Sequence, residues 1–556
     1  MTSARRRTKY STRLLLHASA AALPLVFGQA ARAQTEPAAP APAQAQAQAA
    51  VTLHVERFDV QGNTLLPAER IAAVLDPYKG ERTLAELERA AAALQAAYRD
   101  AGYGAVLASV PPQTPGASGT VTIAVLEGKV AQVRVEGNQH FGADAIRASV
   151  PALQPGATPQ MRQIDTELQM ANENPAKNVD VLLQPGQRAG DVDAELRVTE
   201  QPLQRFTLHA DNSGTETTGR LRAGAGWQHA DLTGHDDVLS IDLDTAPQNP
   251  GNVIVASAGY RYPLYVQHMM LEAYGVYSDI DSGTTATAAG DLQFTGRGSI
   301  VGVRASRYLQ RVGEIDQRIS LALENRDYRN DCQIAGLPEG ACGAAGASVS
   351  VQPVALGYAM QKNGPTSFGF TGFLVHNLML GGSHSSADDF EAIRPGARPH
   401  YTALRINGYA SMPLPKDWLA QARIAGQYTD DGLVPGEQFG IGGAASVRGY
   451  DERELAGDIG ASATLEILTP DLLAPAKRGD PSLRLLAFGD GGWVKNRLGT
   501  ACLGTQTECA IGSLGVGLRG SVGGLEAHLD VGHAMKSASF TKRNDTRVHV
   551  ALSYSF

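Results

Sequence analysis

Apolar residues follow a period of two over the C-terminal two thirds of the chain. From Leu203 onward, segments of about nine to fourteen residues alternate apolar and polar positions between clusters of Gly, Asn, Asp and Pro, with no amphipathic helix. The clearest segment places one set of side chains on a single face: Val548, Val550, Leu552, Tyr554 and Phe556. A tilted strand of ~9–11 residues crosses a bilayer, with lipid on one face and a polar lumen on the other. The pattern therefore predicts a transmembrane antiparallel β-barrel of about sixteen strands over residues 202–556.

Residues 51–201 contain a pattern of alternating strand and helix signals that occurs twice. Each half contains a strand, a Gly-Asn turn, two helices and two further strands, and the turn Gly62-Asn63 recurs as Gly137-Asn138. Thr83 and Glu86 form a capping box at the start of one helix. The sequence thus predicts two α/β modules, 51–127 and 128–201. A small sheet has a free edge that can accept a strand from an extended peptide, and the alternative is that both modules are rigid spacers.

The first fifty residues have the composition of a targeting segment and a linker. A basic start, an apolar run from Leu14 to Phe27 and the small-residue site Ala31-Arg32-Ala33 predict a signal peptide over residues 1–33. The alternative, a membrane anchor, is disfavoured because the apolar run is shorter than the ~20 residues of a spanning helix. Residues 34–50 are almost wholly Ala, Pro and Gln, which predicts a linker.

The charge balance and the absence of common motifs exclude several classes of protein. The chain has 48 basic and 56 acidic residues among 556, and the predicted signal peptide is basic, so the remainder is strongly acidic. Such a surface disfavours nucleic-acid binding, which depends mainly on Lys and Arg. No nucleophile elbow, zinc-binding His pair or phosphate-binding loop is present, so neither an enzyme nor a cofactor or metal site is predicted.

The four cysteines form two close pairs, Cys332 with Cys342 and Cys502 with Cys509. Counting strands from the periplasm places these pairs after the seventh and thirteenth strands, and connections after odd-numbered strands lie on the outer side of the membrane. Close spacing and a secretory route favour disulfides, although connectivity cannot be read from spacing. Metal binding is the weaker alternative, because no His spacing accompanies either pair.

The most informative segment runs from Phe439 to Tyr450, inside the predicted connection 431–457 between the eleventh and twelfth strands. Its end, Val447, Arg448, Gly449 and Tyr450, resembles the loop signature of the barrel-assembly superfamily, in which the tip folds back into the lumen. A second segment, residues 488–492, is similar to the strand motif of that superfamily, with Phe488, Asp490 and Gly492 at the matching positions. The resemblance implies that Arg448 pairs with Asp490. Glu466, on the intervening strand, is a second candidate partner.

Two further matches narrow the resemblance to the two-partner secretion transporters. The first match to these transporters is residues 211–219, after the first barrel strand. The second combines three short segments, residues 170–175, 183–186 and 198–200. The resemblance implies periplasmic POTRA domains and a monomeric outer-membrane barrel that exports a secreted partner exoprotein without ATP. It also implies contact with outer-membrane lipid, and barrel-assembly machinery that uses Phe556 as an assembly signal. The plug helix of many members is in doubt here, because residues 34–50 contain three prolines, Pro37, Pro40 and Pro42.

Four alternatives remain open from the sequence. An assembly factor that inserts other barrels would share the loop and strand motifs, although the segment around Asn174 argues against it. A passive porin would not need two soluble modules. A soluble β-helix or propeller is disfavoured by the secretory signal and by the lack of a short repeat. For Arg448 itself, the alternative to a role in export is a role in barrel stability alone.

Overall fold

The computed structural model describes residues 52–556, except 114–118, 216–217, 251–252, 281–283, 288–289, 294–295, 330–346 and 474–479. The predicted signal peptide and linker lie outside the described residues. Within them the chain forms two α/β modules followed by a β-barrel. Among the described helices, none combines the length and apolar character needed to cross a bilayer.

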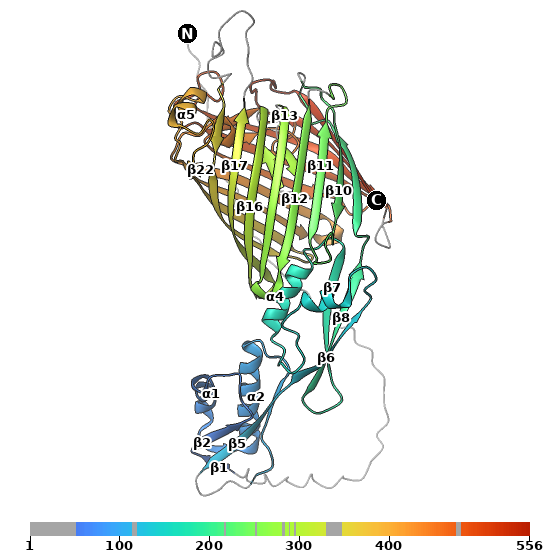
Figure 1. Cartoon of the computed structure of the whole chain (residues 1–556), viewed down its shortest axis with the longest axis vertical. Helices are drawn as coiled ribbons and strands as arrows, with labels where there is room; N and C mark the ends of the chain where they lie inside the picture. The colour runs from blue at the N-terminus through green and yellow to red at the C-terminus, as the bar shows by residue number, and fades with distance from the viewer. Residues whose placement is uncertain are drawn as a thin grey trace, which may run out of the picture. The chain divides into compact units, whose positions relative to one another are not determined.

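Sixteen antiparallel strands form a closed barrel, which confirms the predicted fold class. The eighth strand is interrupted at Gln352, and both of its parts pair with the seventh. Figure 1 shows six of these strands side by side in one wall: β10, β11, β12, β13, β16 and β17. The strands are β9 (Gln204–Asp211), β10 (Arg222–His229), β11 (Val238–Thr245), β12 (Ile254–Leu264), β13 (Met269–Ile280), β16 (Gly296–Val312), β17 (Ile315–Arg329), β18 (Val349–Val351) with β19 (Pro353–Lys362), β20 (Ser367–Asn377), β21 (Thr402–Pro413), β22 (Leu419–Thr429), β25 (Ile459–Leu468), β26 (Ser482–Lys495), β27 (Glu508–Val522), β28 (Leu525–Ala534) and β29 (Thr546–Ser555).

The two faces of the barrel wall differ as the alternating pattern predicts. Large apolar side chains such as Leu321, Leu465 and Leu552 point outward and are about half exposed. Their neighbours along each strand, such as Glu466 and His549, are polar and buried. An outward apolar band and a polar interior are what a barrel in a bilayer requires.

The barrel closes where β29 pairs with β9, in a register that joins Ser555 to Thr207 and Ala551 to Asp211. Beyond the last pair, Phe206 and Phe556 exchange two backbone hydrogen bonds of 2.9 Å, and their rings stack 5.8 Å apart. Phe556 therefore lies at the closing seam.

The first module is built on a three-stranded sheet of order β2-β5-β4, in which β2 and β5 are parallel. Helices α1 and α2 bury Leu75, Leu94 and Tyr98 against this sheet (Figure 1). The capping box expected at Thr83 and Glu86 begins α2. The elements are β1 (Thr52–Val55), β2 (Arg57–Gln61), α1 (Ala68–Leu75), η1 (Asp76–Tyr78), β3 (Gly80–Thr83), α2 (Leu84–Asp100), β4 (Val106–Ser109) and β5 (Thr120–Glu127). The sequence pattern merged β1 with β2 and missed β3, which pairs with β1.

The second module repeats this arrangement with a sheet of order β6-β8-β7, in which β6 and β8 are parallel. Its elements are β6 (Lys129–Glu136), α3 (Ala143–Ala148), α4 (Met161–Ala171), β7 (Lys177–Pro185) and β8 (Asp191–Glu200). The second module has the predicted order of helices and strands, and the first has the same order with β3 added between its helices.

The repeated Gly-Asn turn is built in the same way twice. Gly62 and Gly137 both have a φ of 86°, and a Cβ on them would lie 2.2 and 2.3 Å from a carbonyl oxygen of β5 and β8, respectively. A carboxylate at the end of the last strand then accepts the backbone N–H groups after the turn: Glu127 from Thr64, and Glu200 from His140. Burial of Glu200 opposes its ionisation, but the N–H donors at residues 139–141 outweigh this and lower its pKa.

One helix in the barrel region, α5 (Ala387–Ile393), contradicts the expectation of a helix-free segment. It begins with a capping box of Ser386 and Asp389 and buries Phe390 and Ile393 in a cluster with residues of β17, β18, β20, β21 and positions 433–434. The remaining short elements are η2 (Tyr265–Gln267), β14 (Thr284–Thr287), β15 (Gly290–Gln293), η4 (Pro415–Asp417), η5 (Pro435–Glu437), β23 (Phe439–Ile441) and β24 (Leu455–Gly457).

Candidate functional site

Residues 431–457, here called the lumen loop, connect β22 with β25, the eleventh and twelfth strands. Within the loop β23 pairs with β24, and the hairpin lies against β25 and β26. Its tip turns at Gly442, Gly443 and Gly449, which all have positive φ values that favour glycine. The tip contacts side chains on the inward face of the barrel wall, which gives the loop its name.

Arg448, at the tip, is buried and bound to carboxylates on three strands. Its Nε and Nη2 donate to the two oxygens of Asp490 at 2.8 and 2.9 Å, and its main-chain N–H donates to Asp490 at 3.1 Å. Its Nη1 lies 2.6 Å from Glu466 and 3.4 Å from Asp530. The guanidinium is therefore held bidentately, the geometry for which Arg is suited.

Two further arginines complete the charge balance of this cluster. Arg519 binds Asp530 through two hydrogen bonds of 2.8 and 3.0 Å, and Arg423 lies 3.4 Å from Glu466. With Arg448, three guanidinium groups face three carboxylates. Because an unpaired charge away from water is costly, removal of Arg448 would leave the cluster with one excess negative charge.

The other residues of the predicted motifs surround Arg448. The ring of Phe488 lies 3.4 Å below its guanidinium, in a cation–π contact. Val447 is fully buried and lies against Gly492, where a Cβ would come within 3.0 Å of it. The hydroxyl oxygen of Tyr450 lies 3.0 and 2.9 Å from the carbonyl oxygens of Gly512 and Lys536, either of which can accept its proton. The structure thus brings both motifs together around one guanidinium.

Sequence reasoning missed Asp530 and His549, which also contact the tip. His549 accepts the main-chain N–H of Gly449 through Nε2 at 3.0 Å. Both residues occupy inward positions of alternating strands, so the pattern marks them as polar lumen residues. It carries no information on which of them meets the loop.

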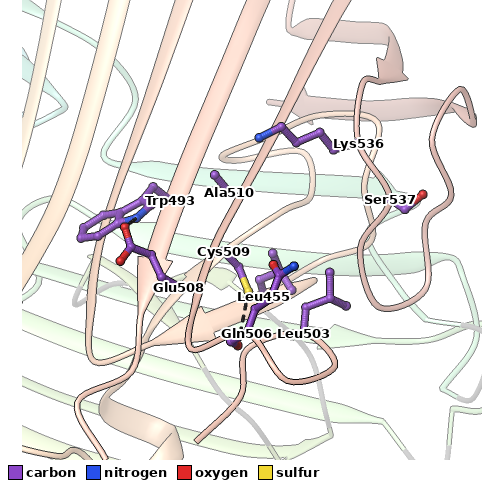
Figure 2. A pocket seen from close by; sticks show the side chains of 9 residues that line it. All are labelled: Leu455, Trp493, Leu503, Gln506, Glu508, Cys509, Ala510, Lys536 and Ser537. Carbon is purple, nitrogen blue, oxygen red and sulfur yellow. Dashed lines mark hydrogen bonds between the residues drawn. The ribbon is translucent and has the colours of Figure 1, made fainter. Parts of the chain in front are cut away.

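The hairpin between β26 and β27 packs on the lumen loop. Cys502 and Cys509 form a disulfide in this hairpin, between the thirteenth and fourteenth strands, whereas Cys332 and Cys342 lie outside the described residues. A pocket of about 500 Å³ lies beside Cys509. Leu455 of the loop and Leu503 of the hairpin are among its lining residues (Figure 2). The disulfide therefore braces a segment that helps to cover the loop.

The segment around Asn174 contacts the connection between β10 and β11. Asn174 donates through Nδ2 to the Ala230 carbonyl at 2.5 Å and to Asp236 at 2.6 Å. Lys177, with no exposed side-chain surface, forms an ion pair with the same Asp236. Tyr265 also donates to Asp236. One buried carboxylate of the barrel thus binds three polar side chains, two of them from the second module.

A closed sixteen-stranded barrel with a loop pinned inside it, preceded by α/β modules with small sheets, defines a class of outer-membrane transport proteins. Residues 190–520 match the family described as haemolysin secretion/activation protein ShlB/FhaC/HecB, and residues 53–128 match the POTRA domain of ShlB type. The chain belongs to the ShlB/FhaC/HecB family of two-partner secretion transporters. It is accordingly an outer-membrane β-barrel with periplasmic POTRA-type structure.

Relatives of known name agree with this assignment. The chain is 21% identical over 402 residues to the heme/hemopexin transporter protein HuxB of Haemophilus influenzae strain 86-028NP, with 70% of this chain and 67% of that protein covered. The structure resembles CdiB from Escherichia coli with a TM-score of 0.77, 18% identity and 93% of each chain covered. CdiB from Acinetobacter baumannii gives a TM-score of 0.68 at 17% identity, with 91% of this chain and 90% of that chain covered.

Proposed function

We propose that this protein exports a large secreted partner protein of haemolysin or adhesin type through its barrel. The modules at 51–127 and 128–201 bind the extended partner in the periplasm, and the barrel at 202–556 conducts it across the membrane. The chain has no phosphate-binding loop, and folding of the partner outside the cell supplies the driving force. Outer-membrane lipid surrounds the monomeric barrel, which the barrel-assembly machinery inserts.

The contact between Arg448 and Asp490 carries this proposal. It ties the tip of a 27-residue loop, residues 431–457, to the inner wall, so the loop lies on the path that a partner chain must follow. The sheet edges of the modules support the first step. In the described part of the chain, β4 and β7 each pair with one strand only, which leaves backbone groups for an added strand.

The test measures secretion of the large protein encoded beside this chain. Cells carry the wild type, Arg448→Ala, a deletion of residues 52–126, or Arg423→Ala as a matched control. Arg423 is a lumen arginine that touches Glu466 from the wall and is about half exposed. Heat-modifiability on gels reports whether each barrel is folded.

We expect Arg448→Ala and the deletion to fold and to stop secretion, while Arg423→Ala secretes normally. Secretion by both the Arg448→Ala variant and the deletion would reject dedicated export and favour a porin or an assembly factor. Equal loss in Arg448→Ala and Arg423→Ala would show that only the charge of the lumen matters.

A further inference from the structure

We propose that Glu437 is a second anchor of the lumen loop, opposite in charge to Arg448, and that it positions the loop for export. Glu437 lies in η5 at the base of the loop, eleven positions before Arg448. The inference rests on the proposed function when secretion is measured. It does not depend on that function when the conductance of the channel is measured.

The carboxylate of Glu437 is fully buried and accepts hydrogen bonds from three side chains. Arg326 donates through Nη1 to both oxygens at 2.9 and 3.0 Å, and Arg405 donates through Nη2 at 2.7 Å. The hydroxyl of Tyr328 adds a bond of 2.8 Å. Both oxygens are therefore saturated by donors that the barrel wall supplies.

The main chain at the base is held as well. Gln427 donates from one amide group to the carbonyls of Glu437 and Asp458, both at 3.0 Å, and so joins the two ends of the loop. Arg394, beside α5, binds the side chain of Asp458. These contacts fix the base of the loop independently of the contacts at its tip.

The two anchors bind different parts of the barrel wall. Glu437 binds arginines on β17 and β21, the seventh and tenth strands, whereas Arg448 binds acids on β25, β26 and β28. The most distant of these strands, β17 and β28, are half the circumference apart, and the nearest, β21 and β25, are separated by β22 alone. The loop is therefore fixed to the wall at two separate places.

The opposite charges of the two anchors specify how the loop is attached. The negative group of Glu437 binds a site of arginines on the wall, and the positive group of Arg448 binds a separate site of acids. If Glu437 and Arg448 exchanged sites, each would be buried among groups of its own charge. If the loop shifted and either residue left its site, the like charges of that site would remain buried without their partner. Glu437 is accordingly a positioning residue: it acts on export through the place it gives to Arg448.

Glu324 offers a matched control in the same cluster. It binds Arg326 through a hydrogen bond of 2.6 Å and accepts from Tyr274, but it belongs to β17 and does not touch the loop. Neutralisation of Glu324 or of Glu437 removes one negative charge beside Arg326. Only the second change detaches the loop.

The experiment compares Glu437→Gln, Glu324→Gln and the double variant Glu437→Gln with Arg405→Gln, which restores the charge balance. Purified full-length chains are checked for heat-modifiability and then measured in planar bilayers for single-channel conductance. Secretion of the neighbouring protein is scored separately. If Glu437→Gln does not fold, the double variant alone is compared with Glu324→Gln.

We expect Glu437→Gln and the double variant to show a wider spread of single-channel conductance than the wild type and to lose secretion, while Glu324→Gln behaves like the wild type in both measurements. An equal effect of Glu324→Gln, or full recovery in the double variant, would overturn the proposal and leave Glu437 with charge neutralisation only. Absence of secretion in the wild type would reject the export function, whereas the conductance comparison would still decide the role of Glu437.

Discussion

Gly449 of the lumen loop and Gly532 of β28 meet backbone to backbone. A Cβ on Gly532 would come within 2.6 Å of the Gly449 nitrogen, and a Cβ on Gly449 would come within 3.0 Å of the Gly532 carbonyl. The tip of the loop can approach the wall this closely because neither residue has a side chain.

Substitution of Gly532 by Ala should displace the tip without removing any charge. The added methyl group would have to move the loop backbone, at a cost of about 1–3 kcal/mol typical of overpacking. We expect trypsin to cleave the folded protein within the lumen loop, as seen by mass spectrometry of the fragments. Gly491→Ala is the control, since a Cβ there meets nothing within 4 Å; cleavage in both variants would contradict the prediction.

Substitution of Lys177 by Met should weaken the contact between the second module and the barrel. It leaves Asp236 buried without its cation, a change that typically costs about 3–5 kcal/mol. We expect faster hydrogen exchange in residues 230–237 of the full-length protein.

The double variant Lys177→Met with Asp236→Asn tests the reason for this loss. Asn keeps the hydrogen-bonding shape and tolerates the positive φ of 64° at this position. We expect it to recover most of the protection. Exchange as fast as in the single variant would show that the charge is not the cause.

Substitution of Gly137 by Ala should unfold the turn of the second module. The new Cβ would lie 2.3 Å from the Val198 carbonyl oxygen at a φ of 86°, so neither a small shift nor a rotation relieves it. We expect early cleavage of the second module in limited proteolysis. Gly142→Ala, in open space at a φ of −62°, should leave the cleavage pattern unchanged.

The lowered pKa of Glu200 makes the second module dependent on pH. A carboxyl whose pKa is lower in the folded than in the unfolded state stabilises the fold above its ordinary value of 4.5, and this stabilisation is lost as the pH falls through the folded-state pKa. We expect wild type to resist urea better than Glu200→Gln at neutral pH, and equally in strong acid, by circular dichroism of the helices. A constant difference would contradict this, and Glu136→Gln, at an exposed position, should match wild type at both pH values.

The sequence predicts what depends on local periodicity. The alternation of residues 547–556 defines the two faces of β29, and the paired turns at Gly62 and Gly137 reveal the duplicated module before any coordinates. Strand β3, by contrast, is four largely polar residues, Gly80–Thr83, whose extended form depends on pairing with β1 rather than on its own pattern.

Only part of the site can be predicted from the sequence, for a related reason. The two motifs name Arg448 and Asp490, but Glu437 lies in a connection without periodicity, and its partners Arg326 and Arg405 come from strands far away in the chain. Helix α5 is similar: its capping box is visible, yet seven residues form a helix here because Phe390 finds a buried cluster. Tertiary contacts that join distant segments decide both cases.

The closing seam has a consequence for the order of folding. The hydroxyls of Thr207 and Ser555 lie 3.1 Å apart but are separated by 348 positions in the chain. All other neighbouring pairs of barrel strands are adjacent in the chain and can form by short steps, whereas this pair must wait until β29 has been delivered. The barrel therefore has one slow, non-local closure step, and until that step β9 and β29 remain as two unpaired edges that a chaperone or the membrane insertion machinery must keep from pairing with other chains.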